Sequence, residues 1–239
     1  MGAATPPFRS ITACPEFLFW HNNGASAPRR EKPLWFLPDS HPAFSPASAR
    51  WLRGRTTFPL PLVATTGDQL IRATKVEKGQ TILLTGAVGS VGRMALFSAL
   101  EIGAKVIAGV RKAQINEALK AGATEAIDVN DDAAIAKLPV LDAVADTVGG
   151  TVTTKIIGKV KPGGFLATVT SAPANASEFK VTVKAISSAP DPKAYVHYGT
   201  AVRDGKLVLP IEKTFPMAEA AEAQAFAEKG NVGKVVLTA

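Results

Sequence analysis

The feature that most constrains the fold is an alternation of short apolar runs with helix-length segments, which begins after residue 59. The apolar runs are residues 81–85 (TILLT), 105–110 (KVIAGV), 125–129 (EAIDV), 141–148 (LDAVADTV), 164–170 (GFLATVT) and 179–186 (FKVTVKAI). Helical patterns cover residues 67–74, 90–102, 112–121 and 151–159, with a shorter one near Ala133. Nearly continuous apolar strands separated by helices are typical of a parallel sheet covered on both faces. The sequence therefore predicts a doubly wound α/β domain over residues 59–204, with a ligand crevice at the carboxyl ends of its strands.

Composition narrows the class of protein further. The chain has 239 residues, of which 46% are hydrophobic, enough for one large domain or two small ones. No apolar run approaches the roughly 18 residues that a membrane span needs. The single cysteine, Cys14, permits no internal disulfide, and the three histidines lack zinc-ligand spacing, so we expect no metal site. These features favour a reducing compartment, and we expect a cytoplasmic protein.

The net charge of +7 raises the question of nucleic-acid binding. About +4 of it falls on residues 1–58 and about +3 on the longer remainder, by formal count. Neither part has a stripe of Arg and Lys with interleaved aromatic residues, which would mark a nucleic-acid surface. We therefore expect no nucleic-acid partner.

Residues 1–58 differ in composition from the rest of the chain. They contain all three Trp, the only Cys and eight of the seventeen Pro, but only one of the seventeen Lys. They show neither strand nor helix periodicity, so we predict an irregular or disordered extension. Pro15 and Glu16 interrupt any secretory signal. Two alternatives stay open: an organellar transit peptide, and a stretch that is not an evolved protein segment.

A glycine-rich turn joins the first apolar run to the helical pattern that follows it. Its glycines are Gly86, Gly89 and Gly92, in the order GAVGSVG. In such a turn the first glycine allows a tight bend, the second lets backbone N–H groups approach an anion, and the third lets the helix pack on the sheet. No Gly-Lys-Ser/Thr follows, which disfavours a mononucleotide P-loop. The turn therefore predicts a site for the pyrophosphate of a dinucleotide.

The end of the next strand indicates which dinucleotide. A site that prefers NAD usually has an Asp or Glu there to hold the ribose hydroxyls. This chain has Arg111 and Lys112, whose charges suit the 2′-phosphate of NADP(H). We predict NADP(H), with the alternative that both residues are ordinary surface cations at a helix start.

From about Phe58 to Ala239 the chain resembles medium-chain dehydrogenase/reductases, in particular the zinc-independent quinone oxidoreductase (zeta-crystallin-like) branch. The motifs that carry the resemblance are PLPLVATTGDQLI, KGQTILLTGAVGSVG, KVIAGVRK, LKAGATEAIDVN, LDAVADTVGG, KPGGFLATVTS and DGKLVLPIEKTFPMAEAAEAQAFAEKGNVGKVVL, in this order. The resemblance implies hydride transfer from NADPH to a small-molecule electron acceptor, a quinone or an activated enone, without a metal.

The resemblance also implies the role of individual residues. The residues expected near the nicotinamide are Thr66, Val169 and Thr170. Those expected at the pyrophosphate are Gly89 to Val91, which include Ser90, together with Gly86, Ala87 and Gly92 of the same turn. Arg111 and Lys112 are expected at the 2′-phosphate, Thr147 and Val148 beside the adenosine, and Lys234 over the cofactor. Val129 stands where many relatives have a Tyr, which removes one expected contact to ribose or adenine.

The resemblance does not extend to residues 1–58. Members of this branch carry an N-terminal, mostly β, GroES-like catalytic domain, and we find no part of it there. Residues 205–239 resemble the strand-helix-strand remnant that completes that domain. Residues 179–186 are expected to form a homodimer contact, or alternatively a plain edge strand. A non-catalytic dinucleotide-binding module is therefore the alternative to an active reductase.

No residue is assigned a catalytic role from the sequence. Tyr195 and Tyr198 lack the Lys four positions later that a short-chain reductase needs. His197 and Tyr198 are expected at an interface or at the edge of the core. Asp142 and Asp146 lie four apart on one predicted strand, and we expect hydrogen-bonded structural carboxylates.

Overall fold

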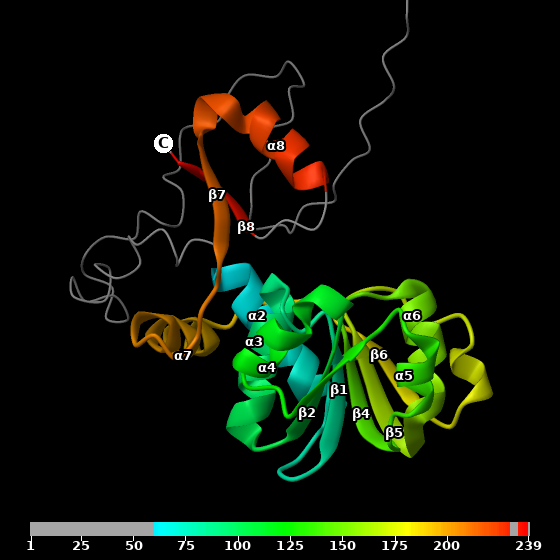
Figure 1. Cartoon of the computed structure of the whole chain (residues 1–239). Helices are drawn as coiled ribbons and strands as arrows, with labels where there is room; N and C mark the ends of the chain where they lie inside the picture. The colour runs from blue at the N-terminus through cyan, green and yellow to red at the C-terminus, as the bar shows by residue number, and fades with distance from the viewer. Residues whose placement is uncertain (1–59, 230–233, 239) are drawn as a thin grey trace, which may run out of the picture. The chain divides into compact units, whose positions relative to one another are not determined.

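The computed structural model describes residues 60–229 and 234–238 of the chain (Figure 1). The predicted extension, residues 1–58, lies outside this part. The elements of the α/β domain are α2 (Leu60–Thr74), β1 (Thr81–Thr85), α3 (Ser90–Ile102), β2 (Lys105–Val110), η1 (Lys112–Gln114), α4 (Ile115–Lys120), β3 (Glu125–Asp128), α5 (Asp132–Ala136), β4 (Leu141–Asp146), α6 (Gly150–Ile156), η2 (Ile157–Lys159), β5 (Val160–Thr168), η3 (Ala176–Glu178), β6 (Thr182–Ala185) and α7 (Pro192–Arg203).

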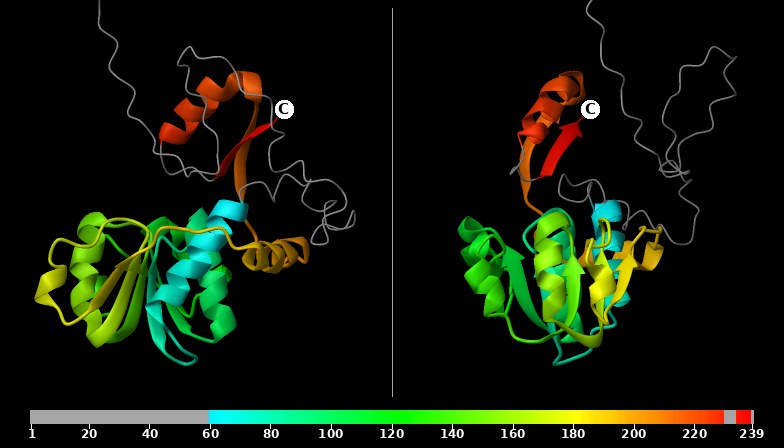
Figure 2. Two further views of the ribbon diagram at one scale, coloured as in Figure 1. Left: turned by 180° about the vertical axis from the view of Figure 1, so that it is seen from behind. Right: turned by 90° about the vertical axis from the view of Figure 1, so that its right-hand side faces the viewer.

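Six parallel strands form the sheet, in the order β3-β2-β1-β4-β5-β6. The order reverses between β1 and β4, where the chain returns after β3 to the other side of β1. Because all strands are parallel, their carboxyl ends lie at one edge of the sheet (Figure 2). This confirms the doubly wound fold and places a crevice at the carboxyl ends of β1 and β4.

Two helical layers cover the sheet. Leu70 of α2, Ala95 of α3 and Ala118 of α4 pack on one face, in a cluster with alternate residues of the central strands. Ile135 of α5 and Ile156 of α6 pack on the opposite face (Figure 1). Burial on both faces explains why β1, β2 and β4 are nearly uniformly apolar in the sequence.

Helix α2 begins at Leu60, seven residues earlier than the predicted start at residue 67. Its first turns contain Val63, Thr65 and Thr66, which have low intrinsic helix propensity. They are helical because Leu60 and Val63 pack with α3 and α7 in a third buried cluster. Tertiary packing therefore overrides local propensity at this end of the helix.

A buried hydrogen-bond network fixes α7 against α2 and α3. The Tyr198 hydroxyl donates to Asp68 Oδ1 at 2.6 Å and lies 2.5 Å from Ser98 Oγ, while Arg72 Nε donates to Asp68 Oδ2 at 2.6 Å. Burial and the hydrogen bond to Asp68 raise the pKa of the Tyr198 hydroxyl well above its usual value. The structure thus confirms the expected role of Tyr198 at the edge of the core.

Other predicted elements differ from the structure as well, and the strand predicted over 164–170 is β5, Val160–Thr168. The helix predicted over 112–121 divides into η1 and α4, and the strand predicted over 179–186 is limited to β6. The strand predicted to reach residue 148 ends at Asp146, because its carboxylate accepts hydrogen bonds from the Val148 and Gly149 N–H groups and turns the chain.

The C-terminal residues form a separate strand pair with one helix. The elements are β7 (Ile211–Pro216), η4 (Met217–Glu219), α8 (Ala220–Glu228) and β8 (Lys234–Thr238). β7 pairs with β8 in parallel, which confirms the predicted strand-helix-strand order. β7 begins only at Ile211, since Leu207 and Leu209 pack with α2 and α7 instead. None of the helices in the described part of the chain is long and apolar enough to cross a membrane.

Candidate functional site

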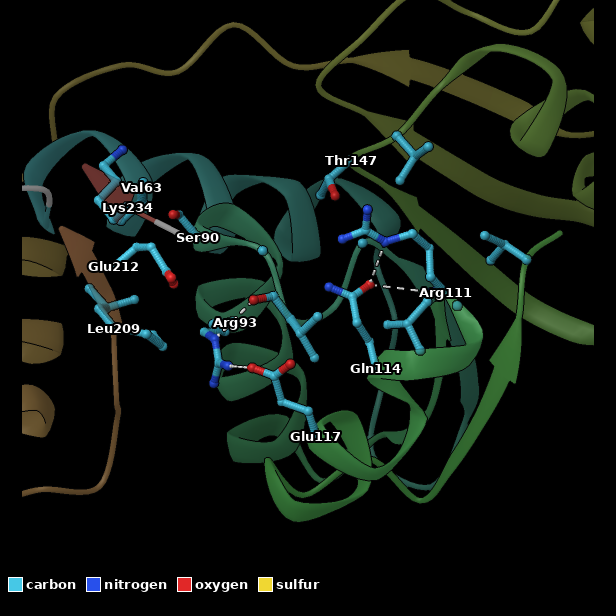
Figure 3. A pocket seen from close by; sticks show the side chains of 18 of the residues that line it. Val63, Ser90, Arg93, Arg111, Gln114, Glu117, Thr147, Leu209, Glu212 and Lys234 are labelled. Carbon is cyan, nitrogen blue, oxygen red and sulfur yellow. Dashed lines mark hydrogen bonds and ion pairs between the residues drawn. The ribbon is translucent and has the colours of Figure 1, made fainter. Parts of the chain in front are cut away.

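A pocket of about 950 Å³ opens at the carboxyl ends of β1, β2 and β4 (Figure 3). Its lining includes the glycine turn, the end of β2, the residues after β3 and β4, and part of the C-terminal strand pair. The lining residues are Val63, Gly86, Val88, Gly89, Ser90, Arg93, Gly109, Val110, Arg111, Gln114, Glu117, Val129, Asn130, Thr147, Val148, Val152, Leu209, Pro210, Glu212, Ala227, Lys234 and Val235.

Two glycines of the turn are required by its geometry. Gly86 has φ of +66°, and a Cβ there would lie 2.3 Å from Thr147 Oγ1. A Cβ on Gly92 would lie 2.0 Å from the Gly86 carbonyl oxygen, so α3 packs directly against the turn. Gly89 is less restricted, because its φ of −70° suits any residue, although a Cβ there would lie 3.2 Å from the Gly86 carbonyl oxygen, closer than an ordinary contact. Gly89 also lines the pocket.

The N-terminus of α3 faces this pocket without a side-chain cap. Its N-cap residue is Gly89, no side chain caps the first turn, and the first turn has no acidic residue. Ser90, the first residue of the helix, lines the pocket. Uncapped N–H groups and the positive end of the helix dipole favour an anion at this position.

The buried carboxylate of Asp146 holds the loops beside the turn in place. It accepts hydrogen bonds from the hydroxyls of Thr85, at 2.7 Å, and Thr168, at 2.6 Å, and from the N–H of Gly149 at 3.0 Å. Burial alone would raise the pKa of Asp146, but these hydrogen bonds outweigh it and lower the pKa. The side chain thus joins the ends of β1, β4 and β5, and the sequence-based expectation of a structural carboxylate is confirmed.

Asp142, at the other end of β4, is structural as well. Its carboxylate accepts from Lys161 Nζ at 2.6 Å and from the Thr81 N–H at 2.8 Å. These two interactions lower its pKa. Asp142 and Asp146 therefore do not form an acid/base pair.

At the end of β2, Arg111 lines the pocket and Lys112 does not. Arg111 precedes η1, and its backbone N–H and its Nε both donate to Gln114 Oε1, at 3.3 Å and 3.2 Å. This leaves the terminal nitrogens of the guanidinium without an intramolecular bond among the described residues (Figure 3).

The comparisons with known proteins agree with this geometry. A family described as zinc-binding dehydrogenase matches residues 121–237. A quinone oxidoreductase from Coxiella burnetii is similar in structure, with 26% identity and a TM-score of 0.69 over 75% of this chain. An alcohol dehydrogenase superfamily protein from Novosphingobium aromaticivorans also has 26% identity, with a TM-score of 0.60 over 72% of the chain. The chain belongs to the medium-chain dehydrogenase/reductase family.

Similarity to a third solved structure shows the fold alone. A thermostable alcohol dehydrogenase from Pyrobaculum aerophilum is 20% identical, with a TM-score of 0.63 over 77% of the chain. The chain spans 59%, 58% and 56% of the lengths of these three structures. No curated protein sequence matches it.

Enzymes of the medium-chain dehydrogenase/reductase family bind nicotinamide dinucleotides, and the pocket fits one. The uncapped start of α3 and the terminal guanidinium nitrogens of Arg111 suit a ligand with several phosphate charges. Among the described residues, no group of three or more His, Cys, Asp or Glu side chains is arranged to hold a metal ion.

The pocket brings together half of the residues predicted for the cofactor in this medium-chain dehydrogenase/reductase. Those that line it are Gly86, Gly89, Ser90, Arg111, Thr147, Val148 and Lys234. Those outside its lining are Thr66, Ala87, Val91, Gly92, Lys112, Val169 and Thr170. Gly92 and Ala87 instead pack within the turn and the core, and Thr170 hydrogen bonds to Thr168 and Asp146.

Sequence reasoning missed several lining side chains, notably Arg93, Gln114 and Asn130. A signal existed for two of them. Arg93 directly follows the last glycine of the turn, and Gln114 lies three residues after Arg111, the spacing of a capping box. Asn130 has no such signal, because its place depends on the turn after β3, where its backbone N–H donates to Asp128 at 3.0 Å.

Proposed function

We propose that this chain binds NADP(H) and serves as an oxidoreductase that transfers hydride from NADPH to a quinone or activated enone. Arg111 carries the choice of cofactor: a cation lines the pocket at the end of β2, where an NAD site usually has a carboxylate. The named activity of the similar structure from Coxiella burnetii, quinone oxidoreductase, supports the acceptor class.

The proposed binding mode follows the order of elements around the pocket. The turn and the start of α3 hold the pyrophosphate, Arg111 holds the 2′-phosphate, and Thr147 and Val148 lie along the adenosine. Thr66, Val169 and Thr170 are proposed at the nicotinamide and Lys234 over the cofactor. When bound, the nicotinamide supplies the hydride chemistry, and the protein supplies position and a dry environment.

The tyrosine and histidine of α7 do not serve as acid/base groups in this proposal. The Tyr198 hydroxyl is committed to Asp68 and Ser98, and His197 Nε2 lies 2.8 Å from Glu101 Oε2. Neither residue lines the pocket. The second candidate function is dinucleotide binding without turnover. It is favoured because Glu117, Glu212 and Lys234 are the only acid/base side chains in the described lining, with no His, Tyr or Cys among them.

We also propose domain boundaries, a dimer contact and a cellular location for the chain. Residues 59–204 are the cofactor domain, and residues 205–239 belong to the catalytic region. β6 lies at an end of the sheet, which leaves one of its edges open for a homodimer contact. A cytoplasmic location suits the single cysteine.

Arg111→Met and Lys112→Met test the cofactor assignment as a matched pair. Arg111→Met should weaken NADPH binding roughly 10- to 100-fold, the worth of one charge-assisted hydrogen-bonded contact, and leave NADH nearly unchanged. Lys112→Met removes the same charge one residue away, outside the pocket lining, and should change either affinity by less than about threefold. Isothermal titration with both nucleotides measures the four changes.

Equal losses of NADPH and NADH in Arg111→Met would contradict the assignment of the 2′-phosphate. A larger selective loss in Lys112→Met would transfer the role to that residue.

A further inference from the structure

Arg93 and Glu117 form an ion pair inside the proposed cofactor pocket. Arg93 Nη2 contacts Glu117 Oε1, and Arg93 Nε donates to the Val88 carbonyl oxygen at 2.9 Å (Figure 3). Arg93 and Glu117 come from α3 and α4, and Val88 comes from the glycine turn. One guanidinium therefore joins the pyrophosphate turn to the helix that follows Arg111.

We propose that Arg93 is a positioning residue that sets cofactor specificity: it neutralises Glu117 and keeps this carboxylate from repelling the 2′-phosphate of NADPH. The inference rests on the proposed function, because it concerns the same pocket and the same ligand.

The charges of the pocket lining give the reason. The lining has three cations, Arg93, Arg111 and Lys234, and two carboxylates, Glu117 and Glu212. Without Arg93 the cations and carboxylates would be equal in number, and Glu117 would face the ligand uncompensated. The 2′-phosphate adds roughly two negative charges to those of NADH at neutral pH. Repulsion from Glu117 should therefore weaken NADPH more than NADH.

The two partners of the ion pair differ in burial. The side chain of Arg93 is only 12% exposed, whereas that of Glu117 is 48% exposed. An arginine keeps its charge throughout the ordinary pH range. Arg93 is therefore the fixed partner of the ion pair. Loss of Arg93 would leave the Glu117 carboxylate free to face solvent and ligand.

A purely structural brace makes a different prediction. If Arg93 only ties α3 to α4 and fixes the Val88 carbonyl, its loss should weaken NADPH and NADH by the same factor. Removing the charge of Glu117 as well would then not restore the affinity for either nucleotide. The ratio of the two dissociation constants separates the two roles, because a general loosening of the turn cancels from it.

The experiment uses the full chain with Arg93→Met, Glu117→Gln and the double variant. NADPH and NADH are titrated separately at low and high salt, and the thermal unfolding midpoint is recorded. Arg203→Met is the matched control, since Arg203 also pairs with a carboxylate, Asp204, but does not line the pocket.

We expect Arg93→Met to reduce the preference for NADPH over NADH by about tenfold at low salt and by less at high salt. The double variant should recover the wild-type preference to within about threefold, and Arg203→Met should leave it unchanged. Glu117→Gln alone should bind NADPH at least as tightly as the wild type, which tests the proposal even if Arg93→Met does not fold.

Equal losses for both nucleotides, no recovery in the double variant, or weaker NADPH binding by Glu117→Gln would overturn the inference while leaving the proposed function intact. Failure of the wild type to bind either nucleotide would overturn both.

Discussion

At the residue scale, the glycine turn shows how one motif combines folding and binding. Gly86 and Gly92 are fixed by contacts within the protein, with the turn and α3 too close for any Cβ. Gly89 has an ordinary φ and lines the pocket. The sequence predicted the structural roles of Gly86 and Gly92, because the spacing of the glycines reflects backbone geometry. Sequence reasoning missed Arg93 and Gln114 in the pocket, although the glycine before Arg93 and the capping-box spacing of Gln114 could have indicated both.

Gly89→Ala tests this division of roles. The variant should fold with a thermal midpoint lowered by only a few degrees. The φ of −70° suits alanine, but the new Cβ would lie 3.2 Å from the Gly86 carbonyl oxygen, which must shift by a few tenths of an ångström. The added methyl group should weaken NADPH and NADH alike, by about tenfold or more, since both share the pyrophosphate.

Gly92→Ala is the contrasting variant and should be strongly destabilised, as its Cβ would lie 2.0 Å from the Gly86 carbonyl oxygen. Unchanged nucleotide affinity in Gly89→Ala would show that the ligand does not approach the turn there.

At the element scale, the order of strands and helices was predictable and several of their ends were not. The apolar strands are buried on both faces, so their sequences alone carry the pattern. The start of α2 depends on packing with α7, which is distant in sequence. The end of β4 depends on the Asp146 carboxylate, which accepts local hydrogen bonds from Val148 and Gly149 and distant ones from β1 and β5. Local propensity does not contain the distant contacts.

Asp142 gives a pH-dependent prediction for the packing of β1, β4 and β5. Lys161 and the Thr81 N–H lower its pKa, so its contribution to stability is present above the ordinary pKa of about 3.9 and is lost as pH falls through the lowered value. Asp142→Asn should reduce the free energy of unfolding by about 0.5–1.5 kcal/mol near neutral pH, a modest amount because the pair is partly exposed.

Urea unfolding of wild type and Asp142→Asn measures this difference at several pH values. The two curves should converge as pH falls through the lowered pKa of Asp142. Lys161→Met should also reduce the free energy of unfolding near neutral pH, but by less than Asp142→Asn does. A difference that stays constant down to this pH would mean that the ionised carboxylate is not what stabilises the strand ends.

At the scale of the whole molecule, the topology of the sheet brings the site together. The reversal of strand order between β1 and β4 gathers the turn, the end of β2 and the loop after β4 around one pocket. The class of ligand could be predicted because the groups proposed to bind it belong to the backbone of the turn and to the strand ends. The acceptor is less well defined by the sequence, because the chain spans only 59% of the similar quinone oxidoreductase structure.

The most direct test is a titration of the purified full-length chain with NADPH and, in parallel, NADH, followed by heat or nicotinamide fluorescence. The central claim predicts that both bind and that NADPH binds roughly 10- to 100-fold more tightly, through the terminal nitrogens of Arg111. If neither nucleotide binds at millimolar concentration, a level that corresponds to about 4 kcal/mol of binding free energy, the pocket is not a working dinucleotide site and the claim fails.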